Sequence, residues 1–217
     1  MTELTLIRHG QAISGARSEA DYDRLSPLGQ QQARWLGDYL AGSGGFDRLL
    51  SGTLRRQRET AEALNISARP HRIDPRLNEL DYFALSKALE ARQGTPFPDS
   101  AESFAAHIPQ VLDFWRAGHA DSHHEPYDAF RERVMAVVRD AATDGPGAVL
   151  VTSTGVIATL CSLALGLEAV MKARLFLRVL NTSVHRFEYR DGVLYLNQFC
   201  ATPHLDIPAR HSARTHF

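Results

Sequence analysis

The chain has almost no lysine, little cysteine and no excess of charge of either sign. Among its 217 residues, 24 Lys and Arg stand against 25 Asp and Glu, and the formal net charge is -1. Proteins that bind nucleic acid or membrane surfaces usually carry basic patches that are visible in their composition. We therefore expect no nucleic acid and no membrane among the partners of this protein.

Lysine occurs only at Lys87 and Lys172, so nearly all of the cations are arginines. The guanidinium group can bind phosphate or carboxylate through two parallel hydrogen bonds, which makes it the better side chain for recognising such anions. The base composition of the genome accounts for the same bias, so the bias alone does not establish a function.

Only two cysteines occur, Cys161 and Cys200, and each lies in an apolar segment. This pattern predicts buried free thiols rather than a disulfide or a metal site. The adjacent His123 and His124 make a poor metal pair, because neighbouring residues on a regular element rarely bind one ion and no suitable ligand spacing accompanies them. We expect no metal and no other cofactor.

Long hydrophobic stretches are also missing. The longest apolar run, from Val156 to Leu167, is interrupted by Thr159 and Ser162 and is too short to span a bilayer. The first residues lack the basic and apolar regions of a signal peptide. We therefore expect a cytoplasmic protein.

The elements that the sequence does predict alternate between strands and helices. Apolar alternation and continuous apolar runs predict strands at residues 3–8, 46–51, 70–73, 147–152, 183–189 and 193–199. Helical spacing predicts helices that begin near residues 27, 53, 127 and 155. This order favours an α/β fold, a three-layer α/β/α sandwich with a mostly parallel central sheet.

Residues 80–125 depart from this alternation, because they hold several prolines and histidines and only patches of helical spacing. We expect one domain over residues 1–217, in which residues 80–125 form an inserted helical cap. Five aromatic side chains of this region either line an apolar pocket or form the core of the cap: Tyr82, Phe83, Phe97, Phe104 and Trp115. The polar tail after Pro208 is expected to be mobile.

Arg8, His9 and Gly10 follow directly on the first predicted strand, where ligands bind in open α/β sheets. Arg8 offers a planar fork of donors for phosphate or carboxylate, and His9 can be a neutral nucleophile or base at working pH. Gly10 lets the backbone turn sharply and lets a ligand come close. The same residues also fit a plain strand end with a solvated arginine and a hydrogen-bonded histidine.

The segment from Ser51 to Arg56 lies where a second strand gives way to a helix. Free backbone N–H groups at a helix N-terminus bind anions, and Arg56 in the first turn would reach the same pocket as Arg8. Alternatively, Arg56 is a solvated helix residue that pairs with Glu59 or Glu62.

Two more sets of polar residues lie near the same edge of the predicted sheet. Ser153, Thr154 and Gly155 follow the most apolar strand and open a helix, so they form either a phosphate cradle or an ordinary helix cap. Glu79 follows the short strand at residues 70–73. A carboxyl group beside a phosphate site would have a raised pKa and could act as a general acid; the alternative is a surface glutamate.

Four segments occur in an order and spacing that are specific when taken together: LIRHGQ (6–11), LSPLGQQQA (25–33), SGTLRRQRETA (51–61) and LNE (77–79). They resemble the motifs of the histidine phosphatase superfamily, the phosphoglycerate-mutase-like proteins, and the resemblance covers most of the chain. A fifth segment, FRERV (130–134), falls where that family has a helix before its last core strand.

The resemblance implies a role for each motif residue. His9 would attack phosphorus and become a phosphohistidine, while Arg8 and Arg56 would hold the phosphoryl oxygens. Glu79 would protonate the leaving alkoxide and then help water to attack the phosphoenzyme. Such chemistry consists mainly of positioning and charge stabilisation, and the arginines would supply the positive charge without a metal.

The sequence departs from the family at one position. The family carries a second histidine after the core strand, in a pattern like V-x-S-H-G, whereas this chain has Thr154 there. A hydroxyl donates one hydrogen bond but brings no charge, and loss of one such donor costs on the order of 10²–10³ in rate. Five histidines are candidates to replace it: His107, His123, His124, His185 and His204. The segment around His204 resembles a C-terminal segment of the family, so we expect His204 to be structural.

We therefore expect a phosphomonoester phosphatase that acts through phospho-His9, with reduced or altered activity. The alternative is a catalytically silent module that binds phosphate or a phosphoprotein. A phosphoglycerate-type mutase is less favoured, because Gln11 stands where mutases carry glutamate. A phosphohistidine protein phosphatase is also less favoured, because those proteins tend to be short, whereas residues 80–125 are expected to form a cap that narrows the pocket. The expected partner is a phosphorylated small molecule or phosphoprotein, and the chain is expected to be a monomer or a homodimer.

Overall fold

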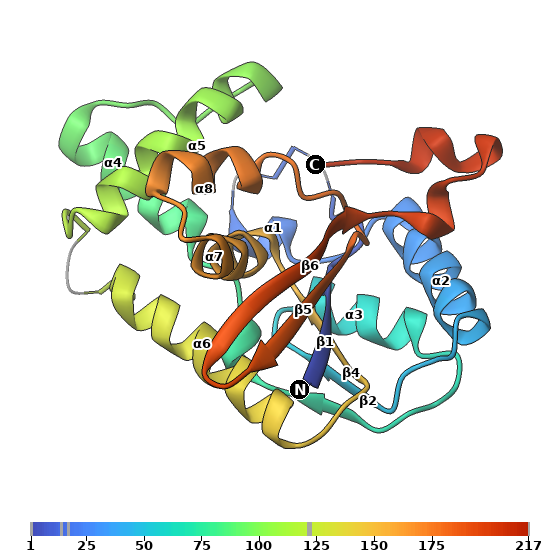
Figure 1. Cartoon of the computed structure of the whole chain (residues 1–217). Helices are drawn as coiled ribbons and strands as arrows, with labels where there is room; N and C mark the ends of the chain where they lie inside the picture. The colour runs from blue at the N-terminus through green and yellow to red at the C-terminus, as the bar shows by residue number, and fades with distance from the viewer. Residues whose placement is uncertain (1, 14, 17, 121–122, 217) are drawn as a thin grey trace.

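The computed structural model describes residues 2–13, 15–16, 18–120 and 123–216. Its centre is a six-stranded sheet in the order β3-β2-β4-β1-β5-β6 (Figure 1). The strands are β1 (Thr2–Arg8), β2 (Arg48–Ser51), β3 (His71–Ile73), β4 (Ala148–Thr152), β5 (Val184–Arg190) and β6 (Val193–Ala201). The first four strands are parallel, and β5 and β6 extend the sheet by antiparallel pairing.

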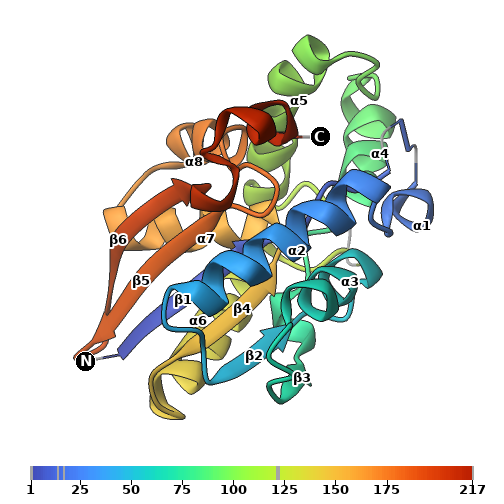
Figure 2. The same ribbon diagram turned by 90° about the vertical axis from the view of Figure 1, so that its right-hand side faces the viewer.

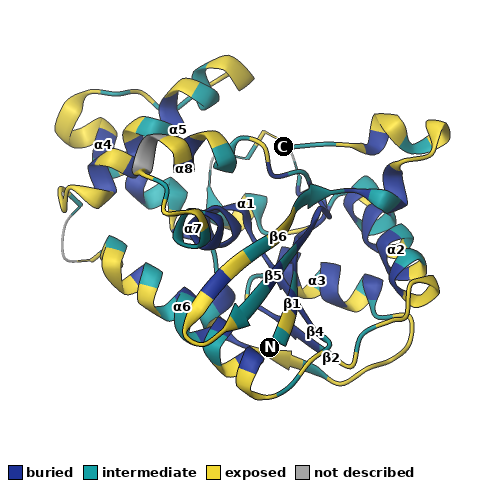
Figure 3. Cartoon of the chain, in the orientation of Figure 1, coloured by how far each residue is buried: buried dark blue, intermediate teal, exposed yellow. Residues whose placement is uncertain are grey.

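The central strands are apolar because helices cover both of their faces (Figures 2 and 3). All five residues of β4 are buried, and so are Leu4, Leu6 and Ile7 of β1. Ile7 packs with α2 and α3 on one face, whereas Leu4 and Leu6 pack with α6 and α7 on the other. These four helices span Pro27–Gly42, Arg55–Leu64, Tyr127–Thr143 and Thr154–Leu165, respectively. The predicted three-layer α/β/α sandwich is confirmed.

Local sequence signals explain where several elements begin and turn. The Ser26 hydroxyl accepts a hydrogen bond from the Gly29 N–H at 3.0 Å, and Pro27 occupies the first position of α2. Asp191 and Gly192 turn the β5–β6 hairpin with φ angles of 53° and 82°. Two successive residues in the left-handed region give the tight turn that suits the twist of a hairpin.

Between β3 and α6 the described residues form helices and turns but no strand, as a helical cap requires. After the one-turn helix η1 (Pro75–Leu77), the chain forms α4 (Tyr82–Gln93) and α5 (Ala101–Arg116), and α5 continues through Pro109. Two helices were not predicted: α1 (Glu19–Tyr22), which follows β1, and α8 (Ala169–Phe176), which packs against α5 and α7 (Figure 1).

The C-terminal tail differs from its predicted mobile state. After η2 (Pro203–Leu205) it forms a further short helix, η3 (Pro208–Ala213), and the residues that follow are hydrogen-bonded to the sandwich. Both cysteines are free thiols, but only Cys161 is fully buried, whereas Cys200 is half-buried. In the part of the chain that the structure describes, no helix has the length and apolar character needed to cross a membrane.

Candidate active site

A cavity of about 350 Å³ lies where β1 and β4 end. Its lining includes five of the seven predicted site residues: Arg8, His9, Arg56, Glu79 and Thr154. The structure thus brings together side chains from four separate segments of the chain at one edge of the sheet. Ser153 and Gly155 are buried behind this lining rather than in it.

His9 is held in one tautomer at the end of β1. Its Nδ1 lies 2.8 Å from the carbonyl oxygen of Gly10, which can only accept, so Nδ1 carries the proton and Nε2 keeps its lone pair. Burial and the positive charges of Arg56 and Arg8 lower the pKa of His9 well below its usual value. His9 is therefore neutral at physiological pH, which is the state that a nucleophilic nitrogen needs.

Gly10 is required for packing rather than for the approach of a ligand. A Cβ at this position would lie 2.5 Å from the carbonyl oxygen of Gly29 in the first turn of α2. A Cβ at Gly29 would in turn lie 2.1 Å from the carbonyl oxygen of Gln11. The two glycines let the loop after His9 lie directly on α2, and this close contact fixes the backbone that carries the histidine.

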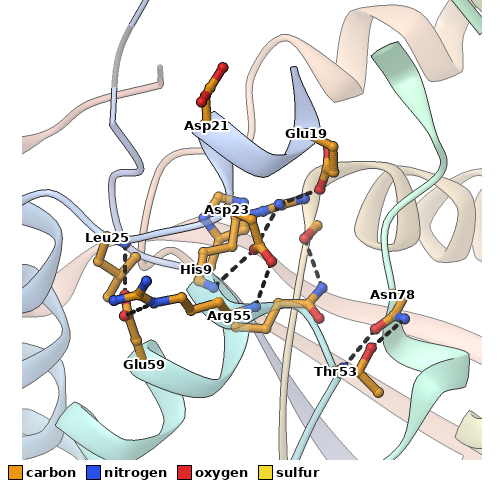
Figure 4. A network of polar contacts seen from close by, with 12 residues as sticks. His9, Glu19, Asp21, Asp23, Leu25, Thr53, Arg55, Glu59 and Asn78 are labelled. Carbon is orange, nitrogen blue, oxygen red and sulfur yellow. Dashed lines mark hydrogen bonds and ion pairs between the residues drawn. The ribbon is translucent and has the colours of Figure 1, made fainter. Parts of the chain in front are cut away.

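The two arginines are buried, and each is held by a residue that also lines the cavity. Arg8 is 5% exposed and donates through Nη1 to the carbonyl oxygen of Val179. Arg56 is 1% exposed, and its Nη1 lies 2.5 Å from Glu19 and 3.0 Å from Asp23 (Figure 4). Both carboxylates come from α1 and the residue after it.

Arg56 therefore does not pair with Glu59 or Glu62, the alternative that the sequence left open. Glu59 instead accepts from Arg55 at 2.6 Å. The guanidinium of Arg56 also lies over the ring of Tyr22, 4.8 Å from its centroid. α1, which the sequence did not predict, thus supplies two of the groups that hold this arginine, Glu19 and Tyr22.

Each arginine keeps one unused donor. The Nε groups of Arg8 and Arg56 are buried and have no hydrogen-bond partner among the described residues. A buried N–H without an acceptor costs about 1–3 kcal/mol, so a group of this kind calls for an explanation. An oxyanion in the cavity that both arginines line would provide the missing acceptor.

Three backbone N–H groups in the first turns of α3 and α7 are already bonded to carboxylates. Asp23 accepts from the N–H groups of Arg55 at 2.8 Å and Arg56 at 3.1 Å, and so caps α3 from outside (Figure 4). The Gly155 N–H at the start of α7 donates to both carboxylate oxygens of Glu79, at 3.0 and 2.9 Å. At these three positions, carboxylate side chains therefore occupy the N–H groups.

The carboxyl group of Glu79, in the cavity wall, is held by several backbone hydrogen bonds. It accepts from the N–H groups of Gly155 and, at 2.9 Å, of Leu80. Burial raises its pKa against the opposing effect of the Gly155 hydrogen bond. A Cβ on Gly155 would lie 2.2 Å from Glu79 Oε1, so only glycine leaves room for the carboxylate there.

Comparison with known proteins shows to which family the chain belongs. The sequence profile of the histidine phosphatase superfamily (branch 1) matches residues 4–202. The chain belongs to the histidine phosphatase superfamily. It is 28% identical over 220 residues to a protein of Enterobacter sp. (strain 638) named as a probable phosphoglycerate mutase, GpmB, with 96% of this chain and 97% of that protein covered.

Solved structures of the superfamily share the fold. A phosphoserine phosphatase of Entamoeba histolytica, solved as a mutant with phosphoserine, superposes with a TM-score of 0.67 at 23% identity, over 94% of this chain and 100% of that one. A mycobacterial glucosyl-3-phosphoglycerate phosphatase in complex with VO3 gives a TM-score of 0.63 at 24% identity, over 93% and 100% of the two chains.

Thr154 lines the cavity, and none of the five histidines named as candidate replacements is in the described lining. His185 and His204 are structural: their Nε2 atoms bond to Ser183 and Thr182, each at 2.9 Å. Burial lowers the pKa of His185 to about 3 and that of His204 to about 4, so both are neutral.

The remaining candidates also lie elsewhere. His107 bonds to the hydroxyl of Tyr82 in the cap, and His124 lines a separate hollow near α6. Besides His9, the described lining of the cavity contains His216, near the C-terminus, which sequence reasoning did not consider. No motif marks it, because the tail reaches the cavity only through the fold. Within the described ranges, no cluster of three metal-ligand side chains occurs.

The wall of the cavity away from the arginines is aromatic. Four of the five aromatic residues singled out in the cap region line it, and α8 adds one more: Tyr82, Phe83, Phe97, Phe104 and Phe176. The rings of Phe83 and Phe97 stack at a centroid distance of 5.7 Å. Trp115 is buried in the cap core against Tyr127 instead.

Proposed function

We propose that this protein is a phosphomonoester phosphatase that works through a phosphohistidine at His9. The observation that carries the proposal is the pair of buried arginines, Arg8 and Arg56, whose Nε donors lack partners within the described chain. They line one cavity with a neutral His9 whose Nε2 holds a lone pair. A phosphoryl group needs such donors for its oxygens and such a nitrogen for in-line attack.

The proposed reaction has two steps. His9 Nε2 attacks phosphorus and the bond from phosphorus to the ester oxygen breaks, while protonated Glu79 gives its proton to the leaving alkoxide. The ionised Glu79 then takes a proton from a water molecule that attacks the phosphohistidine, which releases inorganic phosphate and free His9. The raised pKa of Glu79 supports its role as the acid of the first step.

The comparisons support a phosphatase in general terms. Similar solved structures include phosphatases that act on phosphoserine and on glucosyl-3-phosphoglycerate, although the curated relative bears a mutase name. The carboxylate of a phosphoglycerate would need a further cation to bind it. The cap side of this cavity offers aromatic rings instead. The aromatic wall favours a phosphate ester of a partly apolar alcohol.

The test is hydrolysis of an aryl phosphate by the wild-type protein and by His9→Ala. We expect a loss of at least about 10³-fold in kcat/KM, because the nucleophile is gone. Brief incubation with substrate followed by an alkaline quench should leave a phosphoryl group on the wild-type chain, found by mass spectrometry at His9.

His211→Ala is the matched control, because His211 is exposed on η3, and it should keep full activity. Equal background rates for wild type and His9→Ala would reject catalysis. They would leave the silent phosphate- or phosphoprotein-binding module, which Thr154 in place of histidine already favours.

A further inference from the structure

The residues just before His216 are fastened to the loop that carries the nucleophile. Gln32 is fully buried in α2, and its Oε1 accepts from the Gln11 N–H at 2.8 Å. The Nε2 of the same side chain donates to the carbonyl oxygen of Ala213 at 2.7 Å and to the hydroxyl of Thr215 at 3.0 Å. One buried amide thus ties the tail to the segment that follows His9.

A second buried amide holds Thr215 from the other side. The backbone N–H of Asn181 donates to the carbonyl oxygen of Thr215 at 2.8 Å, and the Thr215 hydroxyl donates to Asn181 Oδ1 at 2.8 Å. Asn181 Nδ2 donates to the carbonyl oxygen of His9 at 3.3 Å. Thr215 is therefore fixed in relation to His9, and the next residue, His216, has its place set by these bonds.

His216 lines the catalytic cavity together with Arg8, His9 and Thr154. Its side chain is half-buried, and burial, together with the positive charges of Arg8 and Arg178, lowers the pKa of this imidazole. In Figure 1 the tail runs from η3 back across the molecule toward its middle.

We propose that His216 donates a hydrogen bond to the phosphoryl group bound in this cavity, and so supplies from the C-terminal tail the imidazole that Thr154 does not. The inference rests on the proposed function, since it concerns the same cavity. A neutral imidazole carries one N–H donor, and a dianionic phosphate beside it would also favour its protonated form. The Thr154 hydroxyl, on the same lining, remains as a second donor.

Loss of one such donor typically lowers the rate by on the order of 10²-fold. We therefore expect His216→Ala to lower kcat/KM by about this factor and to weaken the binding of inorganic phosphate and orthovanadate by about tenfold. His211→Ala, on the same tail but exposed, is the matched control and should change neither quantity. Thermal unfolding of all variants verifies that the fold is intact.

The decisive arm restores an imidazole from the other side. In the His216→Ala background, Thr154→His should raise kcat/KM at least tenfold. In the wild-type background, the same substitution should raise kcat/KM by much less. A merely structural role for His216 would show no such rescue. Two results would overturn the proposal. One is an unchanged phosphate affinity in His216→Ala, and the other is a double variant, His216→Ala with Thr154→His, that recovers no activity.

The two proposals fail in different ways. If the wild-type protein and His9→Ala hydrolyse no ester, the phosphatase proposal fails, yet phosphate binding still tests His216. If the wild-type protein turns over and His216→Ala matches it in kcat/KM and in phosphate affinity, only the role of His216 is wrong.

Discussion

Two regions meet at the cavity, and they differ in how they are built. The residues at the strand ends, among them Arg8, His9 and Glu79, are held by backbone hydrogen bonds to the sheet and to helix starts. The surrounding walls come from α1, the cap and the C-terminal tail, which are joined to the sandwich mainly by side chains. If the proposed function holds, the fixed region carries the chemistry and the walls select and hold the substrate.

This comparison predicts that changes at the strand ends will act on kcat and changes in the walls on KM. Glu79→Gln should show the largest effect of the variants considered below. Without an acid, we expect kcat for an alkyl phosphate to fall by about 10²–10³-fold. An aryl phosphate, whose leaving group needs little protonation, should lose much less, and steady-state rates with both esters check this difference.

The pH profile sharpens the same prediction. Because burial raises the pKa of Glu79, wild-type activity should fall as pH rises through that raised pKa and the acid is lost. Activity should also fall at low pH, where His9 is protonated and loses its nucleophilic lone pair. Because the pKa of His9 is lowered, this acidic limb of the profile lies well below pH 6.5. Glu79→Gln should lack the alkaline limb and keep the acidic one, and an unchanged alkaline limb would remove Glu79 from the mechanism.

The same division explains what the sequence could predict. The strand ends follow from local signals: an apolar strand that ends in Arg8 and His9, and a Ser26 cap before Pro27. These signals gave the layers, the sheet and five of the cavity residues. The bounds of the predicted strands, and the starts of the helices predicted near residues 27, 53, 127 and 155, agree with the structure within about two residues, which is the usual precision at element ends.

The walls were predicted less well because they depend on contacts between distant residues. α1 has only four residues, and its carboxylates take on meaning only beside Arg56, which lies more than thirty positions away. His216 reaches the cavity through Gln32 and Asn181, and nothing in the tail itself indicates this. Gly155 was assigned to phosphate binding, but its N–H is taken by Glu79, a partner that spacing alone does not reveal.

The α1 wall offers a test of intermediate size. Glu19 lines the cavity and places its charge 2.5 Å from Arg56, where it opposes an incoming dianion. We expect Glu19→Gln to tighten the binding of inorganic phosphate by about fivefold and to lower KM, with little change in kcat. Isothermal titration with phosphate measures the first effect. Asp21→Asn, on the same helix but pointing away from the site in Figure 4, is the control.

A loss of phosphate affinity in Glu19→Gln would show instead that the carboxylate holds Arg56 in its working position. In that case α1 belongs with the fixed region, and the division between the two regions would have to be redrawn.

The smallest expected effect concerns the aromatic wall. Phe83 lines the cavity and stacks on Phe97, so its removal should take apolar contact from the alcohol part of the ester and leave the phosphate site alone. We expect Phe83→Ala to raise KM for an aryl phosphate by about threefold to fivefold, with kcat and the inhibition constant of inorganic phosphate unchanged. Phe83→Leu, which keeps most of the apolar volume, should lie close to wild type. Equal losses in kcat and in phosphate inhibition would mean that the cap also positions the strand-end residues, and the separation of chemistry from selection would not hold.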